Sequence, residues 1–309
     1  MGKLDAFDIT SYAYKTVKKT PIYTDVLIPK DVPEGPRPIL IRLHGGFLIT
    51  GSRKQEDWFG LWVSQLASTN GAIFIQPDYR LMPEATGVEI LSDIDDFYTW
   101  FTTELPGVLA KVAPKVTADY DRVVVVGESA GGYLSLQFAL DHKDKLRAAI
   151  SIYPMTDMRD PWYTQDFPKK MAGAPLHPES LIDEYLAAKT EDTVVVDDIS
   201  EKRVGLMFSI VQHGKFLDLI GPQDERLFLD DRVKKGETFP PLFVIHGETD
   251  SSVPFQGTDD LLKLAKEKDA GLEVCFTHPD VEHGFDSNYS LDNPLLAEGV
   301  KFVVEKWLR

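Results

Sequence analysis

The chain has 309 residues, of which 43% are hydrophobic and 27% charged, the composition of an ordinary globular protein. Its 49 acidic residues outnumber the 33 basic ones, giving a formal net charge of −16. Proteins bind phosphates and anionic lipids through clustered Lys and Arg, so this balance argues against nucleic acid or a membrane as a partner.

The sequence also bears on the compartment of the protein. No apolar run approaches the roughly 18 residues that a membrane span needs. The first ten residues contain no apolar stretch of signal-peptide length, and the lone cysteine, Cys275, excludes an intrachain disulfide. We therefore expect a cytoplasmic protein, and a homodimer is left open.

Hydrophobic patterning predicts an α/β fold. Residues 8–29 alternate between polar and apolar side chains, which indicates an antiparallel pair of strands. Beyond Pro38, short apolar runs alternate with helical stretches, a pattern typical of a parallel sheet covered on both faces. The expected strands are 39–43, 72–75, 122–126, 148–153, 241–247 and 272–276, and the expected helices are 57–69, 88–104, 130–141, 257–268 and 292–308. Eight strands, mostly parallel, are predicted in all.

The strand at 39–43 runs into His44-Gly45-Gly46-Phe47. Glycines allow close approach of the backbone, and the N–H groups of this loop, from Gly45 to Phe47, can form an oxyanion hole together with the N–H of Ala130. His44 ends a strand and precedes the candidate nucleophile. We therefore interpret His44 as a support for the loop and not as a base.

A serine stands between a strand and a helix, in Gly127-Glu128-Ser129-Ala130-Gly131. The form G-x-S-x-G in this context is typical of a nucleophile elbow, a sharp strained turn that exposes the serine hydroxyl. The glycines keep neighbouring side chains from colliding in the turn. A helix N-terminus that follows the serine favours negative charge beside it. Ser129 is therefore the predicted nucleophile.

About 85 residues separate the strand at 148–153 from the strand at 241–247. Such a length is too great for a plain loop in a compact domain. We expect a helical cap at 155–239, inserted into an α/β core formed by 1–154 and 240–309. Its aromatic residues Trp162, Tyr163 and Phe167 could line a substrate pocket or pack the cap onto the body.

A serine nucleophile needs a base and an acid, which follow it in the chain in this type of fold. Asp250 comes after the strand at 241–247, and His283 after the strand at 272–276. Glu248 shares the loop of Asp250, and His278 precedes His283, but both lie nearer the strand ends. We predict Asp250 and His283 as partners of Ser129, and no metal or other cofactor, since no cysteine or histidine cluster suggests a metal site.

These segments resemble the α/β-hydrolase fold over roughly 35–305, and within it the hormone-sensitive-lipase-like esterases. The matching motifs are His44-Gly45-Gly46, Asp78-Tyr79-Arg80-Leu81-Met82-Pro83-Glu84, the serine elbow, His246-Gly247-x-x-Asp250 and Glu282-His283-Gly284-Phe285. The resemblance implies that Asp78 and Arg80 belong to the scaffold.

The sequence departs from the pattern of that family in three places. Phe47 stands where the family usually has a third glycine, which would make Gly46 and Phe47 the oxyanion donors with Ala130. The sequence "ATGVE" follows Glu84, and the cap follows the nucleophile. The loop His-Gly-Gly-x-x is also similar to that of kynurenine formamidases.

The pattern predicts a serine hydrolase that cleaves a carboxylic ester of a small, largely apolar substrate through an acyl-enzyme. Hydrolysis of a lactone or an aryl formamide, or acyl transfer to an alcohol, would use the same three residues and remains an alternative. A ligand-binding protein without activity is a third hypothesis, since a fold does not fix a function. Such proteins typically lack a member of the triad, whereas this sequence offers all three.

Overall fold

The computed structural model describes residues 2–309, which contain a sheet of eight strands in the order β1-β2-β4-β3-β5-β6-β7-β8. β1 pairs with β2 and β2 with β4 in the antiparallel sense, and the remaining neighbours are parallel. The strands are β1 (Phe7–Val17), β2 (Thr20–Pro29), β3 (Gly35–Leu43), β4 (Ile73–Pro77), β5 (Val116–Glu128), β6 (Ala148–Ile152), β7 (Leu242–Ile245) and β8 (Val274–Thr277). The predicted α/β architecture is confirmed.

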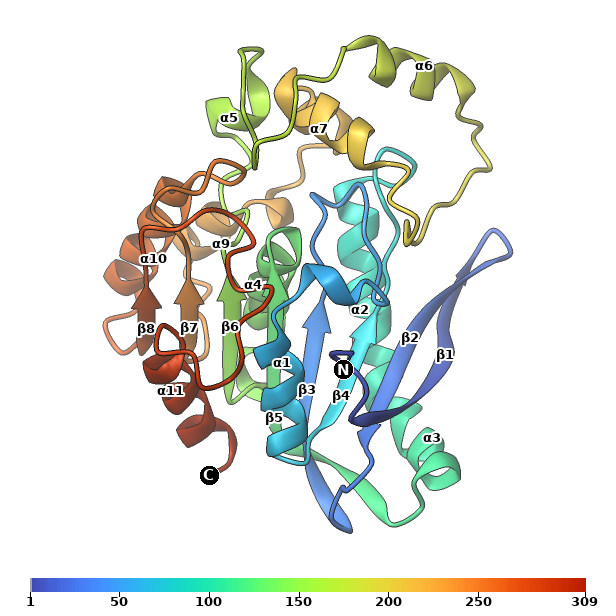
Figure 1. Cartoon of the computed structure of the whole chain (residues 1–309), viewed down its shortest axis with the longest axis vertical. Helices are drawn as coiled ribbons and strands as arrows, with labels where there is room; N and C mark the ends of the chain where they lie inside the picture. Colours follow the sequence, from blue (N-terminus) through green and yellow to red (C-terminus); the bar gives the residue numbers. More distant parts are fainter. Residues whose placement is uncertain (1) are drawn as a thin grey trace.

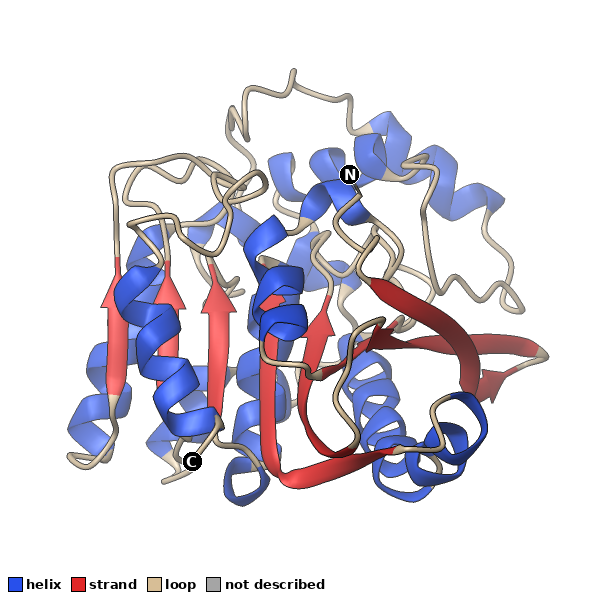
Figure 2. Cartoon of the chain, turned by 60° about the horizontal axis from the view of Figure 1, so that its bottom comes forward, coloured by secondary structure: helices blue, strands red, loops and turns tan. Residues whose placement is uncertain are grey.

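The sheet separates two hydrophobic cores, one on each face. Successive residues of a strand point to opposite faces, so Ile39 and Ile41 of β3 enter one core and Leu40 enters the other. All five residues of β6 are buried, as expected for a parallel strand covered by helices on both sides. β1 instead alternates between exposed and partly buried positions, because it forms an edge of the sheet. The β1–β2 pair bends away from the parallel strands (Figures 1 and 2).

Helices cover both faces, as Figure 1 shows. α1 (Leu61–Thr69) and α11 (Ala297–Trp307) lie on one face, and α2 (Gly87–Thr103), α3 (Leu105–Val112), α4 (Ala130–Asp141) and α10 (Phe255–Lys268) lie on the other. α2 starts at a capping box, in which Thr86 and Glu89 each bond the backbone N–H of the other. None of the helices in the described part of the chain is both long and apolar enough to cross a bilayer.

The segment between β6 and β7 is helical. It contains α5 (Pro161–Thr164), α6 (Ser180–Ala188), α7 (Val204–Gln212), α8 (Phe216–Leu219) and α9 (Leu229–Lys234). α5, α6 and α7 lie above the carboxyl ends of the strands, whereas α9 packs against α10 at the side of the sheet (Figure 1). The division into core and cap at residues 155 and 239 stays a prediction, and α9 already belongs spatially with the core helices.

Arg203 joins this helical segment to the loop after β3. The guanidinium, buried at the start of α7, donates to the carbonyl of Ile49 at 2.8 Å and to Glu84 Oε2 at 2.8 Å. Nearby, the hydroxyl of Thr50 donates to Asp198 at 2.8 Å. These buried polar contacts fix the cap over the glycine-containing loop, because breaking them would leave charges without partners.

Candidate active site

The candidate residues stand on loops that follow β3, β5, β7 and β8, at the carboxyl edge of the sheet and beneath the cap (Figure 1). In open α/β sheets, ligands bind at this edge. The arrangement of the strands in the sheet therefore brings together residues that are far apart in sequence.

Ser129 occupies the sharp turn between β5 and α4, with φ 57° and ψ −118°. A side chain at positive φ is strained, and such strain is typical of functional turns. The two glycines of the motif are required by space: a Cβ on Gly127 would lie 1.9 Å from the carbonyl oxygen of Gly131, and one on Gly131 would lie 2.0 Å from that of Leu43. The turn thus has the geometry of a nucleophile elbow.

His283 and Asp250 contact each other directly. Nδ1 of His283 lies 2.6 Å from Oδ2 of Asp250, whose other oxygen accepts the N–H groups of Ser252 and Val253 at 2.8 Å. Burial raises the pKa of Asp250, but the positive charge and hydrogen bonding of His283, with a further contribution from His246, outweigh it and hold that pKa well below its ordinary value. Asp250 is therefore a carboxylate at neutral pH, and Nε2 of His283 is left for another partner.

The rival residues form a separate pair. Nδ1 of His278 lies 2.6 Å from Oε1 of Glu248, and both side chains are about half exposed. A further carboxylate, Glu282, connects the two loops: its Oε1 accepts the backbone N–H groups of Ser251 and His283, each at 2.7 Å. Glu282 thereby holds the loop after β7 against the loop after β8.

The loop after β3 turns through three consecutive residues at positive φ, namely Gly46 at 108°, Phe47 at 53° and Leu48 at 60°. Among residues 2–309, we find no hydrogen-bond partner for the N–H groups of Gly46, Phe47 and Ala130. The N–H of Gly45 differs, because it donates to Oε1 of the buried Glu128 at 3.2 Å. Gly45, expected among the oxyanion donors, is thus already engaged, and three donors remain.

His44 is buried beneath this loop. Its ring stacks on Tyr79 at 4.2 Å between centroids, its Nδ1 lies 2.8 Å from the carbonyl of Gly45, and the Tyr79 hydroxyl donates to its carbonyl at 2.6 Å. Burial lowers the pKa of His44 to about 3, although the bond to Gly45 acts in the opposite direction. His44 is neutral at pH 7 and braces the loop.

The lowered pKa predicts acid sensitivity. The ordinary pKa of histidine is 6.5, so His44 of the unfolded chain becomes protonated below that pH. In the folded protein the same residue stays neutral until about pH 3. Stability should therefore fall as the pH drops through this window, by up to about 1.4 kcal/mol per pH unit from this residue. We expect His44→Gln to flatten the dependence of the unfolding free energy on pH, measured by urea denaturation between pH 7 and 5.

His278→Gln, at an exposed position, is the matched control and should keep the slope of the unmodified protein. An equal slope in His44→Gln and the unmodified protein would contradict the assignment of a buried neutral His44.

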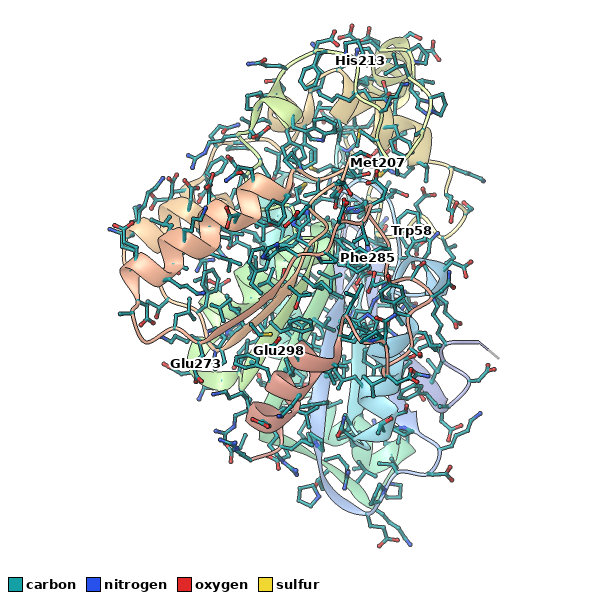
Figure 3. All side chains as sticks on the ribbon, turned by 60° about the vertical axis from the view of Figure 1, so that its left-hand side comes forward. Trp58, Met207, His213, Glu273, Phe285 and Glu298 are labelled. Carbon is teal, nitrogen blue, oxygen red and sulfur yellow. The ribbon has the colours of Figure 1, made fainter. Side chains whose placement is uncertain are left out.

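A cavity of about 300 Å³ opens above the elbow, and both Ser129 and His283 line it. Its walls include Phe47 from the loop after β3, Trp58, and Met207 and Phe208 from α7. Figure 3 shows Met207 of the cap above Trp58 and Phe285 of the body. Asp57 and Glu128 are the charged residues of the lining, which contains no Lys or Arg in the part of the chain that the structure describes. The cavity therefore suits a small, uncharged, largely apolar molecule.

Trp162, Tyr163 and Phe167, expected as pocket residues, are not part of this lining. Tyr163 is buried and packs between Phe47 and Phe216. The indole N–H of Trp162 donates to the carbonyl of Ser252 at 2.9 Å, and Phe167 packs edge-on against Trp162. Trp162 and Tyr163 thus join the cap to the body, which was the other interpretation open from the sequence, whereas Phe167 is an exposed residue that packs within the cap.

Sequence reasoning missed Tyr153 and Asp286. The backbone of Tyr153 has a positive φ of 37°. The centroid of its ring lies 4.4 Å from that of His283, and its hydroxyl donates to Oδ1 of Asp286 at 2.7 Å. Trp62 donates to the other oxygen of Asp286 at 2.7 Å. Burial raises the pKa of Asp286, although these two hydrogen bonds lower it. The only sequence signal was the position of Asp286, three residues after His283.

Three side chains of the cap lie close enough to share a cation: Asp166, Glu179 and His213 each offer a ligand atom within 4.8 Å of the others. The sequence indicated no such cluster, because 13 and 34 residues separate its members. His213 Nδ1 lies 3.4 Å from Asp166, and Lys215 lies 3.2 Å from Glu179, so each carboxylate already faces a basic group. His213 lies at the top of the cap, away from Trp58 at the cavity (Figure 3).

Residues 40–212 match the family model described as alpha/beta hydrolase fold. The chain belongs to this family. The expected resemblance is confirmed, and the match includes the loop after β3 and the serine elbow.

The chain is also similar to individual proteins, in sequence or in structure. It is 28% identical to a probable carboxylesterase M8 of Phoma sp., over 99% of this chain and 98% of that protein. It is 30% identical to a probable carboxylesterase clz11 of Cochliobolus lunatus, over 62% of this chain and 93% of that protein. The crystal structure of esterase B from Lactobacillus rhamnosis superposes with a TM-score of 0.61 at 17% identity, covering 98% of this chain and 86% of that one.

Proposed function

We propose that the protein hydrolyses carboxylic esters through an acyl-enzyme formed on Ser129. The contact of 2.6 Å between His283 Nδ1 and Asp250 Oδ2, in a cavity that Ser129 shares with His283, is the observation that carries this proposal. The similarity to two probable carboxylesterases supports the reaction class.

The first half of the reaction follows from the groups around the cavity. Ser129 Oγ attacks the ester carbonyl and passes its proton to Nε2 of His283, because Nδ1 is held by Asp250. The N–H groups of Gly46, Phe47 and Ala130 stabilise the oxyanion of the tetrahedral intermediate. His283 then protonates the leaving alcohol oxygen, which gives the acyl-enzyme and the free alcohol.

In the second half, His283 takes a proton from water, whose oxygen attacks the acyl carbonyl. The second tetrahedral intermediate expels Ser129 Oγ, which recovers its proton, and the carboxylic acid leaves. Asp250 stabilises the imidazolium in both halves without accepting the proton. Roles for a metal or an organic cofactor are not needed in this sequence of steps.

The lining favours a small neutral acyl group. A cavity of about 300 Å³ lies at the lower end of the range for small-molecule sites, and Phe47 and Phe208 present apolar surface to it. A carboxylate on the substrate would meet Asp57 without a cationic partner in the lining. A cytoplasmic location and a homodimer remain predictions.

A fluorophosphonate probe and a substrate panel test the proposal. We expect stoichiometric labelling of Ser129, located by peptide mass spectrometry, and turnover of p-nitrophenyl acetate and butyrate. A panel with lactones, N-formylkynurenine and an alcohol acceptor separates ester hydrolysis from the alternatives that use the same residues. Folded protein that neither reacts with the probe nor turns over any member of the panel would indicate a ligand-binding protein.

A further inference from the structure

The carboxylate of Asp250 contacts two imidazoles, not one. Its Oδ2 lies 2.6 Å from Nδ1 of His283 and 3.3 Å from Nε2 of His246. The side chains of Asp250 and His246 are both fully buried, whereas His283 is 16% exposed toward the cavity. His246 directly follows β7 and does not line the cavity, so it cannot touch a substrate there.

The surroundings of His246 determine where its proton is. Nε2 faces two acceptors, Asp250 Oδ2 at 3.3 Å and the carbonyl oxygen of Val253 at 3.2 Å, so this nitrogen must carry hydrogen. Nδ1 lies 2.9 Å from the hydroxyl of Thr258 in α10, which can donate to it. The ring also packs edge-on against Phe255 at 5.7 Å. Both nitrogens are thus satisfied: the N–H of Nε2 donates to the carbonyl of Val253 and lies 3.3 Å from Oδ2 of Asp250 on its other side.

A donor aimed at Asp250 affects His283 through their shared oxygen. The N–H of His246 withdraws part of the negative charge of Oδ2, and the carboxylate therefore stabilises the imidazolium form of His283 less strongly. Removing that donor concentrates the charge on His283, which should then hold its proton to higher pH. A general base that stays protonated cannot accept the proton of Ser129.

We propose that His246 is a positioning residue that holds Asp250 against His283 and limits how strongly this shared carboxylate stabilises the imidazolium form of His283. This inference rests on the proposed function, since His283 must act as the base for Ser129. The resemblance to the family pointed to the motif His-Gly-x-x-Asp but implied no role for its histidine. The proposal gives His246 a role in this motif.

The other charged or titratable groups around His283 stay in place in the variants. They are Asp286, whose charge acts on His283, Glu282, which accepts the N–H of His283, and Tyr153, whose ring lies 4.4 Å away. Glu248 is paired with His278. None of these groups contacts His246 among the hydrogen bonds and ion pairs of residues 2–309, so replacing His246 should act on His283 through Asp250.

The test is the pH dependence of the rate at which a fluorophosphonate labels Ser129, in the unmodified protein, His246→Leu and His246→Gln. Loss of an N–H that lies 3.3 Å from the charged oxygen should move the acid limb of the profile up, by at most about one pH unit. We expect labelling of His246→Leu to be up to about tenfold slower at pH 6 and within about threefold of the unmodified protein at pH 9. His246→Gln, whose amide can still donate, should shift less.

Thr258→Val retains His246 but removes the hydroxyl that holds its tautomer, and we expect a smaller shift in the same direction. It supplies the result if His246→Leu does not fold. A rate lowered equally at all pH values, or an equal shift for Leu and Gln at position 246, would overturn the inference and leave the proposed function standing. No labelling of the unmodified protein would instead overturn the proposed function.

Discussion

Replacing Ser129 with alanine is expected to lower kcat for p-nitrophenyl butyrate by about 10⁴–10⁶-fold, with the fold and the stability unchanged. The variant removes the atom proposed to form the acyl-enzyme, whereas the oxyanion donors and the His283–Asp250 contact remain. Positive φ at position 129 costs alanine about as much as serine, so the elbow should form in the same way. Initial rates and circular dichroism spectra measure the two effects.

Ser135→Ala is the matched control for this experiment. Ser135 lies on α4, the helix that follows Ser129, and its hydroxyl donates to the carbonyl of Gly132 without facing the cavity. We expect its kcat to stay within about threefold of the unmodified protein. Ser129→Ala with more than a tenth of the original kcat would be incompatible with a covalent intermediate at this serine.

The second large effect concerns the buried ion pair beneath the elbow. Arg42 of β3 and Glu128, the residue before Ser129, form an ion pair whose side chains are 0% and 3% exposed. Arg42 also donates to Gln76 at 2.6 Å, and Glu128 accepts the N–H of Gly45 at 3.2 Å. Arg42→Met should therefore lower the free energy of unfolding by about 3–5 kcal/mol, because Glu128 would be left as an uncompensated buried charge.

Urea denaturation measures this loss, and Arg42→Met combined with Glu128→Gln gives the comparison. Glutamine carries no charge and its side-chain oxygen can still accept the N–H of Gly45. We expect the double variant to be more stable than Arg42→Met alone, since removing both charges removes the penalty of an unpaired one. A double variant that is less stable than the single one would show that the pair is not the source of the loss.

The same ion pair connects stability with the site. Glu128 holds Gly45, and a Cβ on Gly45 would lie 3.0 Å from the carbonyl of Glu128 and 3.3 Å from Cβ of Ser129. The loop with the candidate oxyanion donors is therefore seated directly on the elbow. A side chain at position 128 that cannot accept the N–H of Gly45 should displace the donors relative to the nucleophile and lower activity, whereas the glutamine of the double variant keeps this acceptor.

Much of the architecture was predictable because the signals are local. Four successive valines at 123–126 indicated a buried strand, and they do lie in the second half of β5, where it pairs with β3 and β6. The ends of elements were less accurate. A single helix at 57–69 was expected, but a 3-10 turn at Glu56–Trp58 precedes α1, since the extended backbone of Phe59 and Gly60 separates the two.

The sequence by itself determined the sheet with its helices and the chain order of Ser129, Asp250 and His283. Strand periodicity and the turn after β5 depend on residues that are close together in the sequence, so they can be recognised without the tertiary structure. Only the tertiary structure decided that His283 pairs with Asp250 while Glu248 pairs with His278, and that Gly45 is engaged by Glu128. It also decided that Met207 and Phe208, and not Trp162, reach the cavity. These outcomes depend on how loops from distant strands and an inserted helical segment pack together, for which no local period exists.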